Sequence, residues 1–294
     1  IRMTQHYRVA ILGAGFGGLG MGAELVRAGI EDFVIFEKAE EIGGVWRDNT
    51  YPGAACDTQA HVYCYSYFPH LRVSQMYAAG EEMLGYQKAM AKEFGLYDHT
   101  KFNSEITEAR WNDDEAYWEL KLRNGETYTA DVFVPAWGQL NAPKTPKWKG
   151  MEDYKGIMFH SAEWNHDVDL KGKKVISIGS AASAVQYVPE IAKEVGHLEV
   201  FQRSANYIFP REQITFTEEQ LDAFEANPEL FEESRRAIHE VREAGFERTR
   251  TDSSAQAEGA QEAIDYLNSV IEDPELREKL TPKFEFGCKR ILRT

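Results

Sequence analysis

The sequence lacks several features that would each place it in a large class of proteins. Its 294 residues contain no secretory signal peptide and no apolar run near the roughly 20 residues that a membrane-spanning helix needs. Its three cysteines, Cys56, Cys64 and Cys288, are too few and too scattered for a disulfide or metal framework. We therefore expect no membrane partner and no metal site, and a reducing cytoplasm is the default location.

Positive charge is scarce as well. Lysine and arginine number 33 against 48 acidic residues, so the net charge is −15, which disfavours nucleic acid as a partner. Any bound phosphate must then rely on local basic residues and backbone N–H groups. With 43% hydrophobic and 12% aromatic residues the chain can bury a sizeable core, and its length favours two domains. Ile1 and Arg2 precede Met3, and the sequence does not specify whether these two residues are native.

The first chemical signal is a strand, a glycine-rich turn and a helix near the start of the chain. An apolar strand over residues 9–12 leads into the spacing G-x-G-x-x-G, which is met by Gly13, Gly15 and Gly18. Such glycines permit a tight turn, close approach of the backbone to a pyrophosphate, and close packing of the helix. A second strand, residues 33–36, ends on Glu37, where an acid is expected to bind ribose hydroxyls. These features predict a dinucleotide site, and the alternative is an ordinary strand–helix turn.

The loop over residues 43–57 carries aromatic and charged side chains. Gly44 and the glycine before it allow the backbone to approach a planar ring, and Trp46 and Tyr51 are placed to pack beside that ring. Asp57 lies among small residues, where its carboxylate would be partly desolvated and would need a partner. The alternative for Asp57 is a solvated turn aspartate.

The strand–turn–helix pattern returns over residues 175–184, with alanines at the second and third glycine positions. The residues of this turn expected to bind a nucleotide are Gly179, Ser180 and Ser183. The next strand, residues 198–201, leads into Arg203 and Ser204 rather than an acid. A guanidinium and a hydroxyl suit a ribose 2′-phosphate, so the second site is expected to prefer NADPH. The alternative is a surface arginine at a strand end.

The remaining sequence predicts regular structure with one irregular stretch. The pattern favours a helix over residues 81–94, a hairpin turn at Asn124-Gly125, and helices over 217–280 that start with a capping box from Thr217 to Gln220. Residues 247–260 are polar and weakly patterned, so we expect a mobile loop there.

These elements predict an α/β protein with two Rossmann-like dinucleotide-binding domains and a helical insertion. The prolines within residues 141–150 mark a linker. We expect residues 6–145 to form the N-terminal part of the first domain, and 150–214 with 281–294 to form the second. The helical insertion is then residues 215–280.

Between the two nucleotide folds, Gly156, His160 and Trp164 have the spacing F-x-G-x-x-x-H-x-x-x-W, with Tyr154 in place of the phenylalanine. A single histidine beside apolar residues is often purely structural, so His160 alone decides little. Two further matches are the G-G-x-W…Y-P-G…D segment and the Lys289-Arg290 pair. Together these motifs resemble those of Baeyer–Villiger monooxygenases, and the resemblance runs from about residue 6 to the last residue.

The resemblance implies FAD in the first fold and NADPH in the second. It implies that Asp57 is the active-site aspartate, that Arg290 is the essential arginine, and that Lys289 and Arg203 recognise the NADP phosphate. His160 would link the two domains rather than react. The implied reaction uses O₂ to form a C4a-peroxyflavin, which inserts one oxygen atom next to a ketone carbonyl to give an ester or lactone. A guanidinium suits this step because it stays charged and donates in a planar fork.

Three alternatives use the same residues differently. A flavin-containing monooxygenase that oxygenates nitrogen or sulfur shares both folds, but its signature ends on another aromatic where Trp164 stands. A disulfide reductase is disfavoured, because Cys56 and Cys64 do not have its C-x₄-C spacing. Members of the resembled family are also longer, so we expect a large C-terminal part to be absent. A nucleotide-binding fragment without turnover is therefore the third alternative. The ketone and the oligomeric state are not specified by the sequence.

Overall fold

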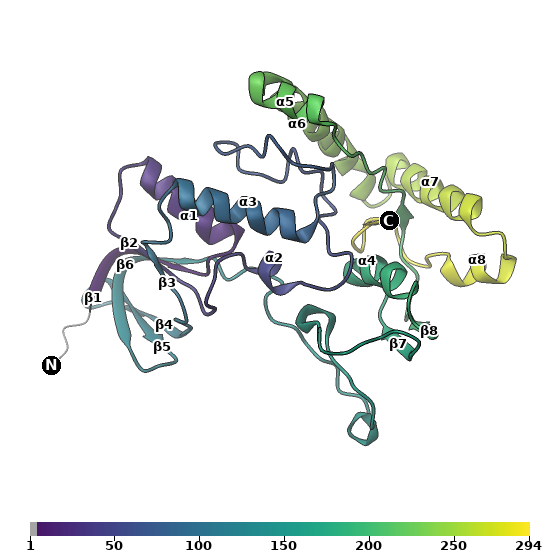
Figure 1. Cartoon of the computed structure of the whole chain (residues 1–294), viewed down its shortest axis with the longest axis horizontal. Coiled ribbons are helices and arrows are strands. Elements are labelled where there is room, and N and C mark those ends of the chain that lie inside the picture. The colour runs from purple at the N-terminus through teal and green to yellow at the C-terminus, as the bar shows by residue number, and fades with distance from the viewer. Residues whose placement is uncertain (1–4) are drawn as a thin grey trace. The chain divides into compact units, whose positions relative to one another are not determined.

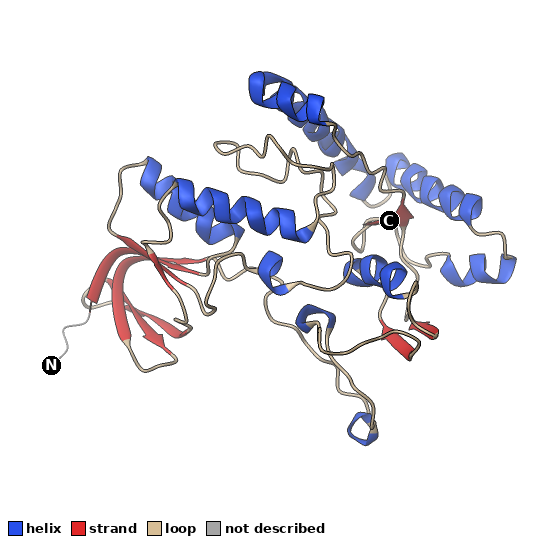
Figure 2. Cartoon of the chain, in the orientation of Figure 1, coloured by secondary structure: helices blue, strands red, loops and turns tan. Residues whose placement is uncertain are grey.

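The computed structural model describes residues 5–294, so Ile1 and Arg2 lie outside the described residues. By its internal contacts the chain forms two compact units. The first unit contains the residues up to Thr50 and Gly80–Trp164, and the second contains Tyr51–Ala79 and Asn165–Thr294. Both units combine strands and helices, which confirms the expected α/β class (Figures 1 and 2).

The first unit is built on a six-stranded sheet. Its strands are β1 (Gln5–Leu12), β2 (Phe33–Phe36), β3 (Thr100–Lys101), β4 (Ile106–Asn112), β5 (Tyr117–Leu122) and β6 (Thr127–Pro135). Their order is β3-β2-β1-β6-β5-β4; β3, β2, β1 and β6 run parallel, and β5 and β4 continue antiparallel. The predicted hairpin turn between β5 and β6 is confirmed, and Gly125 supplies its positive φ of 88°.

Helices cover one face of this sheet. The first unit contains α1 (Phe16–Arg27), α2 (Val45–Asp48), α3 (Gly80–Glu93) and the short 3₁₀ turns Met151–Asp153 and Ser161–Glu163. Helix α1 lies close against β2, since a Cβ on Gly22 would be only 3.1 Å from Ile35 Cδ1. The opposite face of the sheet has its own apolar cluster, in which Ala10, Val34 and Phe36 pack with residues of β5 and β6. Burial on both faces explains the continuous apolar runs of β1 and β2.

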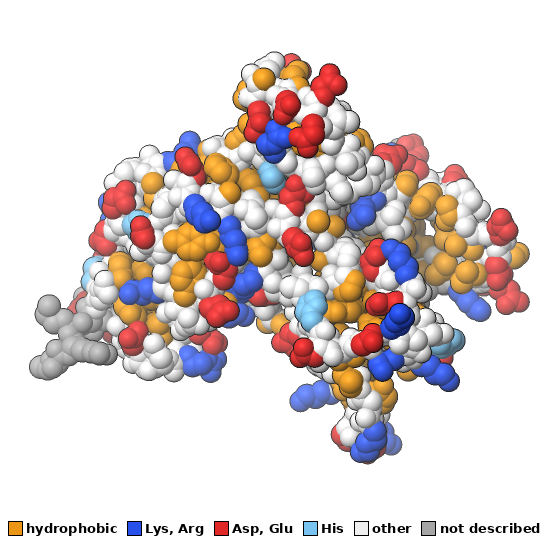
Figure 3. Space-filling view, viewed as in Figure 1, with side chains coloured by type: hydrophobic (Ala, Val, Ile, Leu, Met, Phe, Trp, Pro, Cys, Tyr) orange, Lys and Arg blue, Asp and Glu red, His pale blue; other side chains and the backbone are white. Residues whose placement is uncertain are grey.

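The second unit has two short parallel pairs of strands and most of the helices. Its elements are β7 (Lys174–Ile178), α4 (Ala182–Ile191), β8 (His197–Phe201), β9 (Ile208–Phe209), α5 (Glu218–Ala226), α6 (Pro228–Ala244), the 3₁₀ turn Gly245–Thr249, α7 (Ser254–Val270), α8 (Pro274–Leu280) and β10 (Leu292–Arg293). Strand β7 pairs with β8, and β9 pairs with β10. Acidic side chains gather over α5 to α8 on the face shown in Figure 3.

One predicted helix start is confirmed, and a second helix starts inside a predicted loop. The capping box of α5 is confirmed: Thr217 Oγ1 accepts from the Gln220 N–H, and the Gln220 side chain accepts from the Thr217 N–H. The predicted loop over residues 247–260 is wrong in its second half, because α7 starts at Ser254. The Ser253 hydroxyl caps α7 by accepting from the Gln256 N–H at 3.0 Å. This cap stabilises a helix start that polar composition alone does not reveal.

Residues 51–79 contain no helix and are held by side-chain contacts with α5 and α6. At their centre lies His61, which is fully buried among the rings of Phe216, Phe224 and Phe231, at centroid distances of 5.0, 5.2 and 4.2 Å. Its Nδ1 is 2.8 Å from Ser234 Oγ on α6. Burial, aided by the nearby His70, lowers the pKa of His61 to about 4. The imidazole is therefore neutral at pH 7.

Acid is expected to destabilise the second unit through His61. The unfolded chain binds a proton on this side chain below about pH 6.5, whereas the folded chain does not until about pH 4. Stability should thus fall as the pH drops from 6.5 to 4, by about 3 kcal/mol in total. Denaturant unfolding at pH 7 and pH 4 measures this loss of stability. The His61→Phe variant should lose about 3 kcal/mol less between the two pH values than wild type does. The exposed His239→Phe should behave as wild type, and an equal loss in His61→Phe would contradict the assignment.

Candidate functional site

The glycine-rich turn of the first unit is closely packed. Gly13 has φ +96°, and a Cβ there would be 2.8 Å from the Ala136 carbonyl oxygen. A Cβ on Gly18 would be 1.8 Å from the Gly13 carbonyl oxygen, so only glycine fits. Gly15 differs, since its Cβ would make an ordinary contact of 3.6 Å with Gly44 Cα. The turn therefore needs Gly13 and Gly18 for its own fold, and leaves Gly15 as the glycine that the fold does not require.

Glu37 lies at the end of β2 and its side chain points into this turn. It is 4% exposed; its Oε2 accepts from the Ala14 N–H at 2.8 Å, and its Oε1 accepts from the Ala39 N–H at 2.9 Å. Arg47 Nη1 donates to the same Oε1 at 3.2 Å. Sequence reasoning missed Arg47, although it lies inside the quoted G-G-x-W segment. Its ion pair with a residue ten positions upstream has no sequence signal of its own.

A cavity of about 420 Å³ adjoins this turn. Its lining includes Lys38, Ala39, Val45, Arg47 and Asn49. Gly44 brings the loop next to the turn, because a Cβ on Gly44 would be 3.1 Å from Gly15 Cα. Trp46 follows in α2 and is half-buried. Gly13, Gly15, Gly18, Glu37, Gly44 and Trp46 therefore belong to one region of the first unit. The lining of its cavity is both basic, at Lys38 and Arg47, and acidic, at Asp48 and Glu163.

The histidine signature lies at the C-terminal end of the first unit, in extended chain and a 3₁₀ turn. His160 is the N-cap of that turn, and its Nδ1 accepts from the Ala162 N–H at 3.1 Å. The ring of Trp164 packs edge-on against Phe159, with centroids 5.2 Å apart. The phenol of Tyr154 folds over Gly156, where a Cβ would meet its oxygen at 2.3 Å. The structure gives His160 a capping role.

The second glycine-rich turn lies between β7 and α4. Gly179 has φ +109°, its N–H donates to the Phe201 carbonyl at 2.8 Å, and nothing lies within 4 Å of an added Cβ. Asn206 Nδ2 donates to the Ser180 carbonyl at 2.7 Å and lies 3.2 Å from its hydroxyl oxygen. Sequence reasoning missed Asn206. The carbonyl of Ser180 is thereby fixed by a residue just beyond Arg203 and Ser204.

Basic residues converge on the end of β8. Lys289 Nζ donates to Ser204 Oγ at 2.7 Å and lies 4.2 Å from the centroid of the Phe284 ring. These partners are far apart in sequence, at residues 204 and 289, and the intervening chain is mostly helical. Arg203 is exposed beside them. Lys289, Ser204 and Arg203 thus form a small positive cluster where the sequence predicted a phosphate.

The Asp57 carboxylate is paired with Arg290. Arg290 Nη2 donates to both carboxylate oxygens, at 2.5 Å from Oδ2. The Asp57 side chain is 19% exposed, whereas that of Arg290 is 58% exposed. The carboxylate is therefore largely enclosed, and the guanidinium retains N–H groups that face outward. The partner that the sequence required for Asp57 is the arginine next to Lys289.

Two neighbours of Asp57 other than Arg290, Cys56 and Tyr51, have raised pKa values. Burial raises the pKa of Cys56 to about 12, so its thiol is protonated at neutral pH. Burial also raises the pKa of Tyr51, while a hydrogen bond with Ser183 opposes that increase. Tyr51 and Ser183, which the sequence placed in different motifs, are thus in contact within the second unit.

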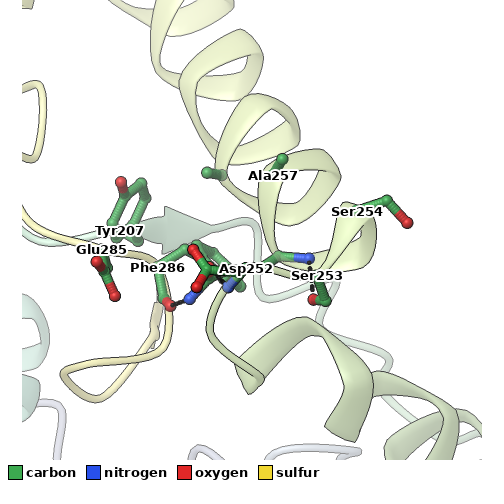
Figure 4. A pocket seen from close by; sticks show the side chains of 9 residues that line it. Tyr207, Asp252, Ser253, Ser254, Ala257, Glu285 and Phe286 are labelled. Carbon is green, nitrogen blue, oxygen red and sulfur yellow. Dashed lines mark hydrogen bonds between the residues drawn. The ribbon is translucent and has the colours of Figure 1, made fainter.

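A second cavity, of about 520 Å³, contains none of the predicted site residues. Figure 4 shows it between the start of α7 and the chain near Phe286, with the rings of Tyr207 and Phe286 beside the carboxylates of Asp252 and Glu285. Within residues 5–294, no helix is long and apolar enough to cross a membrane. The same residues contain no cluster of three or more histidine, cysteine or acidic side chains suited to a metal ion.

Comparison with known proteins gives these residues a context. The family model for flavin-binding monooxygenase-like proteins matches residues 6–215. A Baeyer–Villiger monooxygenase of Streptomyces coelicolor is 39% identical over 99% of this chain and 56% of its own length. A Baeyer–Villiger monooxygenase of Pseudomonas aeruginosa is also 39% identical, over 98% of this chain and 55% of its own length. The chain therefore spans slightly more than half the length of these curated relatives.

Solved structures agree with this result. Cyclohexanone monooxygenase from Rhodococcus sp. Phi1, bound to NADP⁺, has a TM-score of 0.85 and 30% identity, covering 99% of this chain and 62% of that one. An oxidized steroid monooxygenase bound to NADP has a TM-score of 0.86 and 31% identity, covering 98% of this chain and 62% of that one. The resemblance expected from the motifs is confirmed by these similarities. The chain belongs to the flavin-binding monooxygenase-like family.

Proposed function

We propose that this chain provides the FAD- and NADPH-binding parts of a monooxygenase that converts a ketone to an ester or lactone. The balanced reaction is ketone, O₂, NADPH and H⁺ giving ester, NADP⁺ and water. The observation that carries this proposal is the Asp57–Arg290 pair, located in the same unit as the Lys289–Ser204 contact. The two curated relatives described above are named Baeyer–Villiger monooxygenases, which supports the same chemistry.

The first unit fits the dinucleotide part of FAD. Its glycine-rich turn is too tight for a side chain at Gly18, and the backbone at Gly15 is open to a pyrophosphate. The buried carboxylate of Glu37 is positioned for a ribose, and the adjacent cavity offers Lys38 to a charged group, while Arg47 is paired with Glu37 and Asp48. We assign Gly13, Gly15, Gly18, Glu37, Gly44 and Trp46 to this cofactor, with residues 6–145 as the N-terminal part of its domain.

The second unit fits NADPH. Gly179 and Ser180 open the turn before α4, with Ser183 in the first turn of the helix. Arg203, Ser204 and Lys289 supply the positive charge and hydroxyl that a ribose 2′-phosphate requires, because an acid at that place would repel it. We assign these six residues to NADPH binding, and Tyr51 and Asp57 are further proposed cofactor-binding residues. The domain would comprise residues 150–214 and 281–294, with 215–280 inserted, and Gly156, His160 and Trp164 would connect it to the first.

Arg290 and Asp57 are the proposed catalytic residues. Bound FAD would supply the redox and oxygen chemistry, and the protein would hold and stabilise charge. Arg290 is the charge-stabilising group, because a guanidinium remains protonated at any working pH and its outward N–H groups are available. Asp57 fixes one edge of that guanidinium. A small ketone and O₂ are therefore the proposed reaction partners.

Anaerobic addition of NADPH to the chain preincubated with FAD tests the proposal. Loss of the flavin's visible absorption band should show hydride transfer, and air with a cyclic ketone should then give a lactone. Oxidation of an amine or thioether but not of the ketone would assign the chain to nitrogen- and sulfur-oxygenating enzymes. Bound flavin that NADPH does not reduce would instead indicate a nucleotide-binding protein without turnover, and contradict the proposed activity.

A further inference from the structure

One side chain of helix α4, Gln186, makes three hydrogen bonds with the segment that carries Asp57. Gln186 Oε1 accepts from the Tyr51 hydroxyl at 3.0 Å and from the Ala55 N–H at 3.3 Å. Its Nε2 donates to the Ala55 carbonyl at 2.9 Å. A single amide group therefore pairs with both backbone groups of Ala55, two residues before Asp57. None of the motifs in the sequence pointed to Gln186.

The backbone of residues 51–57 also packs tightly on α4. Gly53 has φ +76°, and a Cβ there would be 3.0 Å from the Gln186 carbonyl oxygen and 2.9 Å from Glu190 Cγ. The ring of Tyr51 meets that of Tyr187 edge-on, with centroids 6.0 Å apart. On the other side, the Cys56 N–H donates to the Ala78 carbonyl at 2.8 Å. Residues 51–57 are thus held between α4 on one side and the chain at Ala78 on the other.

We propose that Gln186 is a positioning residue that fixes Asp57, and through it the Arg290 guanidinium, relative to α4. Helix α4 begins at Ala182, directly after the turn assigned to NADPH. Gln186 therefore connects the turn that would hold NADPH to the Asp57–Arg290 pair, which is proposed to be catalytic. This inference rests on the proposed function for its catalytic consequence, but not for its structural part.

Glutamine suits this position because its amide both donates and accepts. A leucine of similar size would leave the Ala55 N–H and carbonyl without partners in a half-buried place, which costs free energy. Glutamate would keep the two acceptor contacts, from Tyr51 and Ala55 N–H, and lose the donor to the Ala55 carbonyl. Gln186→Leu therefore tests the loss of all three hydrogen bonds, and Gln186→Glu tests the loss of the donor alone.

Hydrogen–deuterium exchange of residues 51–57 in the flavin-free chain is the direct test. In Gln186→Leu, exchange of this segment should rise about tenfold, because the Ala55 N–H and carbonyl both lose their side-chain partner. Gln186→Glu should stay within about threefold of wild type at the Ala55 amide, since its acceptor remains. Gln261→Leu, which removes an exposed contact with Asp265 on α7, is the matched control and should change nothing in residues 51–57.

Ligand binding and turnover separate positioning from general damage. The Kd for NADP⁺ of Gln186→Leu should remain within about threefold of wild type, while kcat for ketone oxidation falls about tenfold with little change in KM. Unchanged exchange of residues 51–57 in Gln186→Leu would overturn the inference, whatever the activity. If exchange rises as expected but the wild-type chain oxidises no ketone, the positioning role stands and the proposed function is wrong.

Discussion

Replacing Arg290 by methionine is expected to lower ketone oxidation by about 100-fold or more, because the reacting oxygen atoms lose their charge-stabilising group. Arg290→Lys should recover part of this loss, since it keeps the charge but loses the planar guanidinium, whose Nη2 contacts both oxygens of Asp57. Ester formation with a cyclic ketone, FAD and NADPH is the measurement. Ester formation should decrease in the order wild type, Arg290→Lys, Arg290→Met.

The Arg290 variants should leave the earlier step intact. Anaerobic reduction of bound FAD by NADPH should remain within about threefold of wild type, because the role proposed for Arg290 follows hydride transfer. Arg236→Met, an exposed arginine of α6 whose ion-pair partner is Glu229, serves as the control and should retain full activity. If Arg290→Met slows flavin reduction as much as ester formation, then Arg290 holds the nicotinamide cofactor rather than acting in oxygenation.

Replacing Gly18 by alanine should destabilise the first unit by about 3 kcal/mol or more. The added Cβ would lie 1.8 Å from the Gly13 carbonyl oxygen and 2.9 Å from its carbon, and backbone atoms cannot move aside as a side chain can. Denaturant unfolding followed by circular dichroism measures the loss. Gly85→Ala, at an exposed site in α3 with nothing within 4 Å, should be neutral or slightly stabilising.

Gly15→Ala should separate binding from folding in the same turn. Its Cβ would make an ordinary contact of 3.6 Å with Gly44 Cα, so stability should stay within about 0.5 kcal/mol of wild type. Affinity for FAD should nevertheless fall at least about tenfold, because the methyl group occupies the space where backbone approaches the pyrophosphate. Titration of flavin fluorescence measures it. Equal destabilisation by Gly15→Ala and Gly18→Ala would show that the turn differs from this geometry.

Local patterns predicted the regular elements well. The strand at residues 33–36 has its predicted ends, and the Thr217 cap forms as its spacing requires. These succeed because apolar periodicity and capping depend on residues near one another in sequence. The start of α7 at Ser254 was missed, because the preceding polar residues give no period and the cap is a single serine.

Side-chain partners were predicted less completely. The need of Asp57 for a partner could be inferred from its surroundings, but the contact with Arg290 spans 233 residues. Arg47 with Glu37, Asn206 with Ser180 and Gln186 with Ala55 carried no signal at all. Each of these contacts depends on a tertiary fold that brings separate segments together. The motif over residues 43–57 illustrates the limit, since Gly44 and Trp46 belong to the first unit and Tyr51 and Asp57 to the second.

The pairing of β9 with β10 has a consequence for how this protein can diversify. Leu292 pairs with Ile208 and Arg293 with Phe209, so the long helical excursion begins and ends at the same short ladder. The entropy of closing a loop grows only slowly with its length. Insertions or deletions between α7 and α8 would therefore leave Ser204 and Lys289 in register. Lineages could vary this excursion freely while inheriting the Lys289–Ser204 contact unchanged.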